Sequence, residues 1–485
     1  MINQRKPFAA PYTDPLAQKQ AEILGSKSAW HKIKPAYRLF FLALVTAIMV
    51  AAIWFPVSVG LPLFFAGMLN YLTLISFRIS NNIGRASRRS EHSSGAEAGW
   101  PLYSIIIPLK QEGEVVRGTI RAVEDLVYPD HLKQVLIVVE ETDRLTLDTL
   151  KRIELPPYAA VVVIPENPPF TKGRALLHAL QAAKGDYVTI YDAESRPEPE
   201  QLQKAARVLA GSDGLVCLQA RISISNKDSN WITRNFAGEY YEWYERHLQY
   251  LSAEGHPFGL GGNSFFVGRD VLQRACAWDP FNVTEDADLT VRLVESGVRF
   301  RMLDSETTET CPENTREWTN QRTRWNKGLF ITQLVHFART LRMRHFSADG
   351  WVNFWLPMAC SSLVPFFNLF IPVLFVSGRL PYHWQFLLSV GLWSLLVVNL
   401  ISSTLINKLT YTRLGIRAGW VQAFFDSVAY MFLHIGAGFK AYGEYFWSPL
   451  HWHKTAHQET GEPAHFATVQ PVEVPINQLF NKIRY

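Results

Sequence analysis

The sequence has little net charge, few cysteines and no internal repeat. Its 485 residues carry 48 Lys and Arg against 43 Asp and Glu, a formal net charge of +5. A nucleic-acid-binding protein would show a clustered basic surface, so we expect no nucleic-acid partner. The four cysteines are scattered without a C-x-x-C pair, which argues against a structural zinc site or a disulfide scaffold and favours a reducing compartment.

Charged residues are also absent from a long stretch near the N-terminus. No Asp, Glu, Lys or Arg occurs from Leu39 to Phe77. In helical conformation, this stretch is long enough for two crossings of a hydrocarbon core of about 30 Å. Pro56, Gly60 and Pro62 lie midway and indicate the turn of a transmembrane hairpin, residues 37–78. A signal peptide is the competing interpretation, but its apolar region is shorter, and a basic flank stands where a cleavage site would be expected.

Basic residues flank this hairpin on both sides: Lys27, Lys32, Lys34 and Arg38 before it, and Arg78, Arg85, Arg88 and Arg89 after it. By the positive-inside rule, both ends of the hairpin lie in the cytoplasm. We therefore expect a multi-pass protein of the plasma (inner) membrane whose next segment is cytosolic. Residues 1–36 are predicted to form a flexible cytosolic N-terminus.

Two further charge-free runs, residues 351–377 and 380–407, are each long enough to span a membrane. A third segment, Ala418 to Phe439, contains Asp426 and His434. Because a charge at mid-membrane costs about 3 kcal/mol or more, this segment lies in the interface, faces a polar channel, or spans at a cost. We assign interfacial helices to residues 318–348, transmembrane or interface helices to 349–446, and a cytosolic tail to 447–485.

The region between the apolar blocks, residues 101–330, alternates short β-branched runs with helical stretches. Strands are predicted at residues 104–108, 135–140, 160–164 and 187–191, and helices at 115–126, 145–153 and 174–183. Apolar strands that alternate with helices are typical of a parallel sheet covered on both faces. Ligands of such sheets bind beyond the carboxyl ends of the strands.

Acidic residues follow three of these strands: Glu112 the first, Glu140, Glu141 and Asp143 the second, and Asp192 and Glu194 the fourth. Two carboxylates at i and i+2 past a strand can reach one divalent ion, and oxygen ligands suit Mg2+ or Mn2+. By itself, a D-x-E triplet is more often an ordinary solvated loop. Lys172 and Arg174 precede the next helix, where they could meet phosphate charge; taken singly, they fit a solvated turn.

Two more motifs lie further along the chain. A glycine-rich loop, Gly259 to Gly262, leads through Asn263 into an apolar strand, and Thr284, Glu285 and Asp286 (TED) precede an amphipathic helix. Thr284 is a candidate N-cap with acidic residues in the first turn, so helix capping explains TED without excluding a catalytic role. The second motif, QRTRW (residues 321–325), by itself fits an interfacial anchor.

In the order SIIIPLKQE, VVEETD, YDAE, GLGGNS, TED and QRTRW, enclosed between membrane helices, the motifs resemble those of the processive membrane-embedded family 2 glycosyltransferases, the group of cellulose, curdlan, chitin and hyaluronan synthases. The resemblance covers residues 39–454. It implies an α/β GT-A-type (Rossmann-like) cytosolic domain inserted between transmembrane helices, a nucleotide-sugar donor that we expect to be UDP-linked, and a divalent cation. It also implies a growing β-linked polysaccharide that passes through the lipid bilayer.

The resemblance assigns roles to the donor-side residues. Glu140 or Glu141 would contact the donor base and ribose, and Lys172 and Arg174 would lie near its phosphates. Asp192 and Glu194 would hold Mg2+ or Mn2+ on the diphosphate, with Glu194 in a position where the family usually has Asp. Asp286, with Thr284 and Glu285 beside it, would be the general base that removes a proton from the acceptor hydroxyl during an inverting attack.

On the acceptor side, Gln321 and Arg324 would fix the acceptor and the donor phosphate, and Trp325 would stack on the terminal sugar. A further motif loosely resembles a gating loop that closes over the donor; it contains Trp452, Lys454 and Thr455. The alternative interpretation is a simple interfacial turn. A cytosolic gate requires an even number of membrane crossings.

Two other functions remain open at this stage: single addition of a sugar to a lipid carrier, and a non-enzymatic transporter or receptor with a degenerate domain. An intact QRTRW followed closely by several spans favours the processive synthase. The terminal segments are short for a regulatory module, so regulation is expected from accessory or regulatory subunits.

Overall fold

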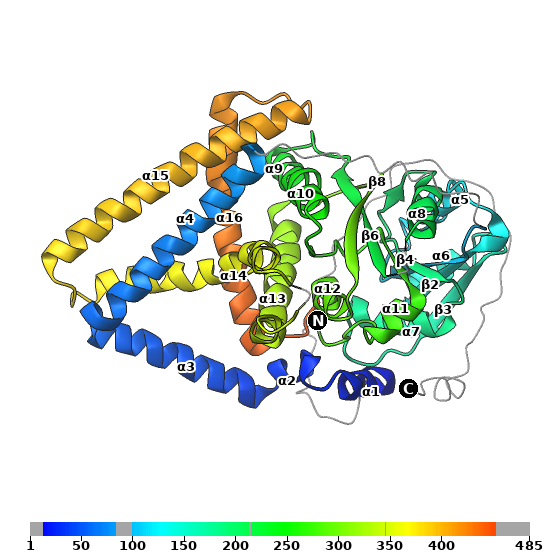
Figure 1. The fold of residues 1–485 in the computed structure, drawn as a ribbon, viewed down its shortest axis with the longest axis horizontal. Helices are drawn as coiled ribbons and strands as arrows, with labels where there is room; N and C mark the ends of the chain where they lie inside the picture. Colours follow the sequence, from blue (N-terminus) through cyan, green and yellow to red (C-terminus); the bar gives the residue numbers. More distant parts are fainter. Residues whose placement is uncertain (1–12, 84–98, 213–214, 345, 453–485) are drawn as a thin grey trace.

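The computed structural model describes residues 13–83, 99–212, 215–344 and 346–452. An α/β domain lies on one side of the molecule and a group of long apolar helices on the other (Figure 1). The N-terminal elements are α1 (Pro15–Leu24), η2 (Gly25–Lys27), α2 (Trp30–Ile33), α3 (Pro35–Trp54), the π-helical η3 (Pro56–Gly60) and α4 (Leu61–Ile83). The C-terminal helices are α13 (Thr315–Thr340), α14 (Ala348–Val376), α15 (Tyr382–Arg413) and α16 (Trp420–Trp447).

The α/β domain contains an eight-stranded mixed sheet. Its strands are β1 (Tyr103–Leu109), β2 (Lys133–Glu140), β3 (Ala159–Ile164), β4 (Tyr187–Ile190), β5 (Arg196–Pro197), β6 (Val216–Ile224), β7 (Phe265–Gly268) and β8 (Arg299–Glu309). Its helical elements are α5 (Val116–Glu124), η4 (Asp130–Leu132), α6 (Arg144–Leu150), α7 (Lys172–Ala182), α8 (Gln201–Ala210), α9 (Trp231–Tyr240), the π-helical η5 (Tyr241–His247), α10 (Leu248–Ala253), α11 (Arg269–Arg274) and α12 (Glu285–Glu295).

The strand order is β3-β2-β1-β4-β7-β6-β8-β5. Strands β1 to β4 are parallel, as the sequence predicts, but β7 pairs antiparallel with both β4 and β6. The sheet is therefore mixed, which corrects the expectation of a wholly parallel one. The antiparallel direction has a consequence for function: the beginning of β7 lies at the edge where β1, β2 and β4 end.

The sheet buries side chains on both faces with a period of two. On β1, Ile105 and Ile107 pack with the apolar side chains of α5 and α8, whereas Ile106 packs with those of α7 and α12. The helices thus cover the two faces, and the carboxyl edge of the parallel strands stays open for a site.

The described part of the segment before the first apolar helix, from residue 13 on, contains short helices. Residues 1–36 were expected to be flexible, yet α1, η2 and α2 pack against the domain. The side chain of Asp14 caps α1 by accepting from the amides of Leu16 and Ala17. Ala17, Ala21 and Leu24 are buried, so this short helix owes its stability to tertiary packing.

Among the described residues, three helices are long and apolar enough to cross a membrane: Pro35–Trp54, Pro56–Asn82 and Tyr382–Arg413. A fourth candidate is α14, which is bent by 49° between two apolar halves. Large apolar side chains are exposed along these helices, for example Leu39 and Trp393 at 66% each. Exposed apolar surface on this scale indicates contact with lipid or another apolar partner.

Candidate active site

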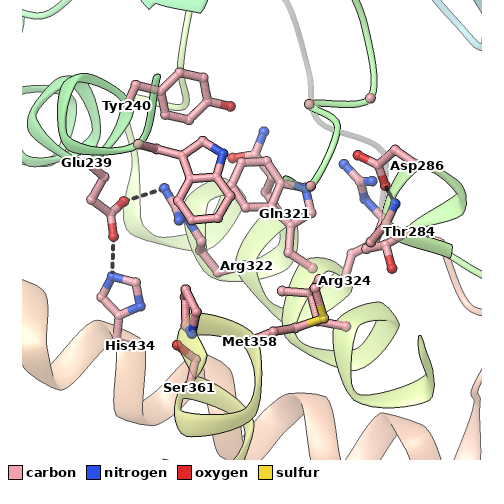
Figure 2. A pocket seen from close by; sticks show the side chains of 18 of the residues that line it. Glu239, Tyr240, Thr284, Asp286, Gln321, Arg322, Arg324, Met358, Ser361 and His434 are labelled. Atoms are coloured by element: carbon pink, nitrogen blue, oxygen red, sulfur yellow. Dashed lines mark hydrogen bonds and ion pairs between the residues drawn. The ribbon is translucent and has the colours of Figure 1, made fainter. Parts of the chain in front are cut away.

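A cavity of about 980 Å³ runs from the carboxyl edge of the sheet to the space between α4, α14, α15 and α16. Most of the residues predicted for function line this one cavity: Glu140, Lys172, Asp192, Glu194, Thr284, Glu285, Asp286, Gln321, Arg324, Trp325 and Trp452. Figure 2 shows Asp286, Thr284 and Arg324 on one side of it and Glu239, Arg322 and His434 on the other. The acidic groups of distant motifs therefore face one space.

The glycine-rich loop reaches this space because β7 runs antiparallel to β4. Asn263, two residues before β7, donates through Nδ2 to Asp192 Oδ2 at 3.1 Å and to Glu309 Oε1 at 2.6 Å. Gly262 has a φ of +80°, a conformation that glycine adopts without strain. The loop thus orients the carboxylate of Asp192.

Lys172 lies at the centre of the acidic cluster. Its Nζ is 2.5 Å from Asp192 Oδ1 and donates to the carbonyl of Gly262 at 3.1 Å. Burial alone would raise the pKa of Asp192, but the charge and hydrogen bond of Lys172, the hydrogen bond from Asn263 and the charge of Arg324 together hold that pKa below its usual value. Asp192 is therefore ionised at neutral pH.

Asp286 occupies the first turn of α12, where its Oδ1 accepts from the amide of Ala287 at 2.9 Å. Burial raises the pKa of Asp286, while that amide and the charge of Lys172 act in the opposite direction. Burial and the neighbouring charge of Asp286 raise the pKa of Glu285 to about 7. A carboxylate with a raised pKa at the wall of a cavity is suited to accept a proton. Thr284 takes the N-cap position as predicted, but its side chain makes no capping hydrogen bond.

Near Asp192 lie two more carboxylates, the half-buried Glu194 and the buried Glu309. Burial and the charge of Asp192 raise the pKa of Glu194 to about 7. Burial and the charges of Glu194 and Asp192 raise the pKa of Glu309 to about 8. Such an excess of buried negative charge and oxygen donors fits a hard divalent cation. Within the described part of the chain, no three His, Cys, Asp or Glu side chains form a complete ligand set, so a cation here would need ligands from its substrate or water.

Helix α13 carries the QRTRW motif along the cavity. The ring of Trp325 lies 6.5 Å from the ring of Tyr240 and 4.5 Å from the guanidinium of Arg322. Arg324 lies 5.6 Å from the ring of Trp452. Four buried polar atoms from these motifs have no hydrogen-bond partner among the described residues: Gln321 Oε1, Arg322 Nε, Arg324 Nε and Trp452 Nε1. Unpartnered polar atoms in a cavity wall are typical of groups that meet a ligand.

Sequence reasoning missed a second charged cluster on the cavity. Glu239 of α9 pairs with Arg322 at 2.5 Å and with His434 of α16 at 2.9 Å (Figure 2). It also accepts from the hydroxyl of Tyr430 at 2.6 Å. Burial would raise the pKa of Glu239, but the charges of Arg322 and His434 and these hydrogen bonds lower it to about 2. The cluster fixes α13 and α16 against the α/β domain.

Two predicted donor contacts do not line the cavity. Glu141 is exposed, and its Oε1 accepts from the amide of Glu166 at 3.0 Å. Arg174 is fully buried behind the wall and binds Glu140 instead, with its Nη2 2.5 Å from Oε1. Of the two alternatives for the donor base and ribose, Glu140 is therefore the one on the cavity. Lys454 and Thr455 lie outside the described residues.

The missed residues have weak sequence signals. Glu309 ends β8, a strand in which charged and hydroxyl residues alternate with apolar ones too irregularly to mark one carboxylate. Glu239 lies on a helix of mixed character, and its partners are 83 and 195 residues away in the chain. Asn263 could have been singled out, since it follows the glycine-rich loop directly.

The fold and site define a glycosyl-transferring enzyme with a GT-A-like, Rossmann-type α/β fold. Comparison with known proteins agrees: residues 101–328 match the model of the glycosyltransferase like family 2. The probable glycosyltransferase YdaM of Bacillus subtilis is 24% identical over 50% of this chain and 59% of its own length. Glucomannan 4-beta-mannosyltransferase 2 of Arabidopsis thaliana is 26% identical over 51% of this chain and 48% of its own length. Residues 101–328 thus form a family 2 glycosyltransferase domain.

The chain spans only about half the length of these curated relatives. Among solved structures, the mannosyltransferase PcManGT from Pyrobaculum calidifontis, in complex with GDP-Man and Mn2+, matches 83% of this chain and 99% of its own, with 14% identity and a TM-score of 0.49.

Proposed function

We propose that the protein is an inverting synthase that polymerises a β-linked polysaccharide from a nucleotide-sugar donor and passes it across the membrane. The observation that carries this proposal is the single cavity that connects the acidic groups of the α/β domain with the space between α4, α14 and α15. A chain extended at Asp286 would have a continuous path from the reaction site into the apolar helices.

In the proposed reaction, Asp286 takes the proton from an acceptor hydroxyl while that oxygen attacks the anomeric carbon of the donor. The bond from the anomeric carbon to the nucleoside diphosphate breaks at the same time, so configuration inverts and no covalent intermediate forms. Lys172 and Arg324 stabilise the departing diphosphate by their charge. Asp192 and Glu194 would hold Mg2+ or Mn2+, which supplies further positive charge to the leaving group when bound.

Trp325 would support the acceptor sugar, because the apolar face of a pyranose packs well on an aromatic ring. Trp452 would close over the donor. It lies 5.3 Å from Lys110 Nζ, so the end of the described chain returns to the donor side of the cavity.

The location of Trp452 bears on membrane topology. We infer that α3, α4, α14 and α15 cross the membrane and that α16 lies in its cytosolic interface. Asp426 of α16 pairs with Arg234 of α9 at 3.2 Å, and His434 pairs with Glu239, so these two residues of α16 find partners on the α/β domain. In Figure 1, α16 crosses the directions of α3 and α14 steeply. Four crossings keep Trp452 on the side of the α/β domain.

A second candidate, transfer of one sugar to a lipid carrier, is favoured by the apolar character of the inner cavity. Side chains of Ile75, Phe367, Ile371, Leu392 and Leu395 line this part. These apolar side chains could pack against a hydrocarbon chain as well as against a glycan.

The two candidates differ in their products. Membranes containing the full chain are incubated with radiolabelled UDP-glucose, UDP-N-acetylglucosamine or GDP-mannose and Mg2+ or Mn2+. A high-molecular-weight product that β-specific glycosidases digest supports the synthase. A labelled product that extracts into organic solvent and carries one sugar supports the lipid-carrier transferase and rejects the synthase.

A further inference from the structure

The N-terminal helix α1 reaches the back of the donor wall through one buried side chain. Helix α1 lies beside α7 (Figure 1), and Asp14, at its N-cap, is fully buried. Asp14 Oδ2 lies 2.9 Å from Nε2 of His178 and 3.4 Å from Nη1 of Arg174, both on α7. The backbone amide of Asp14 donates to the carbonyl of Pro168 at 2.8 Å.

Arg174 connects this helix to the cavity. Its Nη1 also donates to the carbonyl of Pro165 at 2.7 Å, while its Nη2 holds Glu140 Oε1. The other carboxylate oxygen of Glu140, Oε2, lies 3.6 Å from Lys110 Nζ. The Glu140 side chain, at the cavity wall, is thus fixed between one cation behind it and one beside it.

Negative and positive side chains alternate from Asp14 through Arg174 to Glu140 and Lys110. A buried guanidinium is stable only when it is paired, and Arg174 is shared between Asp14 on one side and Glu140 on the other. Burial alone would raise the pKa of Asp14. The hydrogen bond and charge of His178, the amide of Ala17 and the charge of Arg174 together outweigh burial and hold this pKa below its usual value, so Asp14 remains an anion. Without that anion, Arg174 would be held by charge from the side of Glu140 alone and would draw Glu140 away from the cavity.

We propose that Asp14 is a positioning residue for the donor nucleoside, which acts through Arg174 on Glu140, and that helix α1 is thereby part of the donor site. The proposal rests on the proposed function in one respect, the assignment of Glu140 to the donor. It adds a residue outside the matched glycosyltransferase region, 101–328, to the machinery of that region.

The test is nucleotide binding to the full chain purified in detergent, measured by calorimetry with UDP and with GDP in the presence of MnCl2. Asp14→Asn keeps an oxygen that can cap α1 but removes the charge. For the nucleotide that binds the unsubstituted protein, the Kd should rise about tenfold, as expected when a partner that orients a binding group is lost. Asp14→Glu, which restores the charge, should recover most of the affinity.

Gln20→Leu is the matched control. Gln20 docks the same helix on the domain by donating to the carbonyls of Cys276 and Trp278, away from Arg174. If Gln20→Leu weakens binding as much as Asp14→Asn, Asp14 only docks the helix and the proposal is overturned.

A double substitution separates positioning from general destabilisation. In an Arg174→Gln protein, Asp14→Asn should change the Kd by less than about twofold, because the connection is already broken. A full additive loss in that background would contradict the proposed route. These measurements need neither acceptor nor polymer, so a failure to find a polysaccharide leaves them valid, whereas an unsubstituted protein that binds neither nucleotide would reject this donor pocket and the inference with it.

Discussion

Gly262 lies directly against the carboxylate of Asp286: a Cβ atom at position 262 would come within 3.0 Å of Asp286 Oδ2. The two residues come from different motifs, 24 positions apart in the sequence, and meet because β7 begins at the edge where α12 also begins. The carboxylate of Asp286, the proposed base, can therefore take this position only because residue 262 has no side chain.

Gly262→Ala should disturb this contact without unfolding the protein. The added methyl group would push the Asp286 carboxylate, and a misplacement of about 1 Å can lower kcat about a hundredfold. The kcat of sugar transfer is measured for Gly262→Ala and, as a control, for Gly255→Ala. Gly255 also has a positive φ, +69°, but nothing lies within 4 Å of its added Cβ. Similar losses in both variants would mean that backbone strain, and not contact with Asp286, is responsible.

Asp286→Asn should abolish sugar transfer while leaving nucleotide binding within about threefold of the unsubstituted protein. Loss of a general base costs typically 10² to 10⁴ in rate, about 3 to 5 kcal/mol of transition-state stabilisation. Transfer of label and calorimetry of UDP or GDP are measured side by side. Asp270→Asn, at an exposed carboxylate in the first turn of α11, serves as the control. Full transfer activity in Asp286→Asn would exclude Asp286 as the base.

The pH dependence of transfer should report the environment of Asp286. The base works only when deprotonated, so activity falls as the pH drops through its pKa, which burial raises above the ordinary 3.8. Lys172 lowers this pKa by its charge. Lys172→Met should therefore move the acidic limb of the rate profile to higher pH, by about one pH unit.

The profile is measured at saturating donor, since Lys172 also faces the proposed phosphate position. Lys110→Met provides the comparison, because Lys110 pairs with Glu140 on the donor wall. It should weaken donor binding and leave the acidic limb in place. An unshifted limb in Lys172→Met would assign the titration to another group.

The sequence predicts the first half of the α/β domain well and the second half poorly. The runs that become β1 to β4 are continuous and apolar, and their predicted limits lie within a few residues of the observed ones. Strand β8 mixes charged and hydroxyl residues with apolar ones, and its pairing with β6 depends on contacts across 83 to 85 residues. The antiparallel insertion of β7 depends likewise on tertiary pairing, which no local pattern encodes.

The candidate site follows the same division. Asp192, Glu194 and Asp286 were identified because they follow a strand or begin a helix, positions that local sequence reveals. Lys172 and Arg174 were treated alike, yet residues two apart on a helix point to different sides. Lys172 therefore faces the cavity, while Arg174 faces α1 and Glu140. The buried partner Asp14 could not be predicted, because its contact to Arg174 spans 160 residues.

Trp325→Ala should separate elongation from donor hydrolysis. Trp325 lines the cavity and packs beside Tyr240 and Arg322, whereas Asp192 and Glu194, which would hold the metal on the donor, lie after β4 in another part of the cavity wall. Loss of an aromatic platform should therefore reduce polymer length and rate by about tenfold or more, corresponding to about 1 to 3 kcal/mol for a stacked ring, and leave hydrolysis of the donor nearly unchanged. Trp393→Ala, on the exposed surface of α15, controls for general loss of tryptophan from the membrane region. Product length is measured by gel filtration and hydrolysis by release of free sugar; equal losses of both activities would show that Trp325 supports the donor site or the fold and not the acceptor.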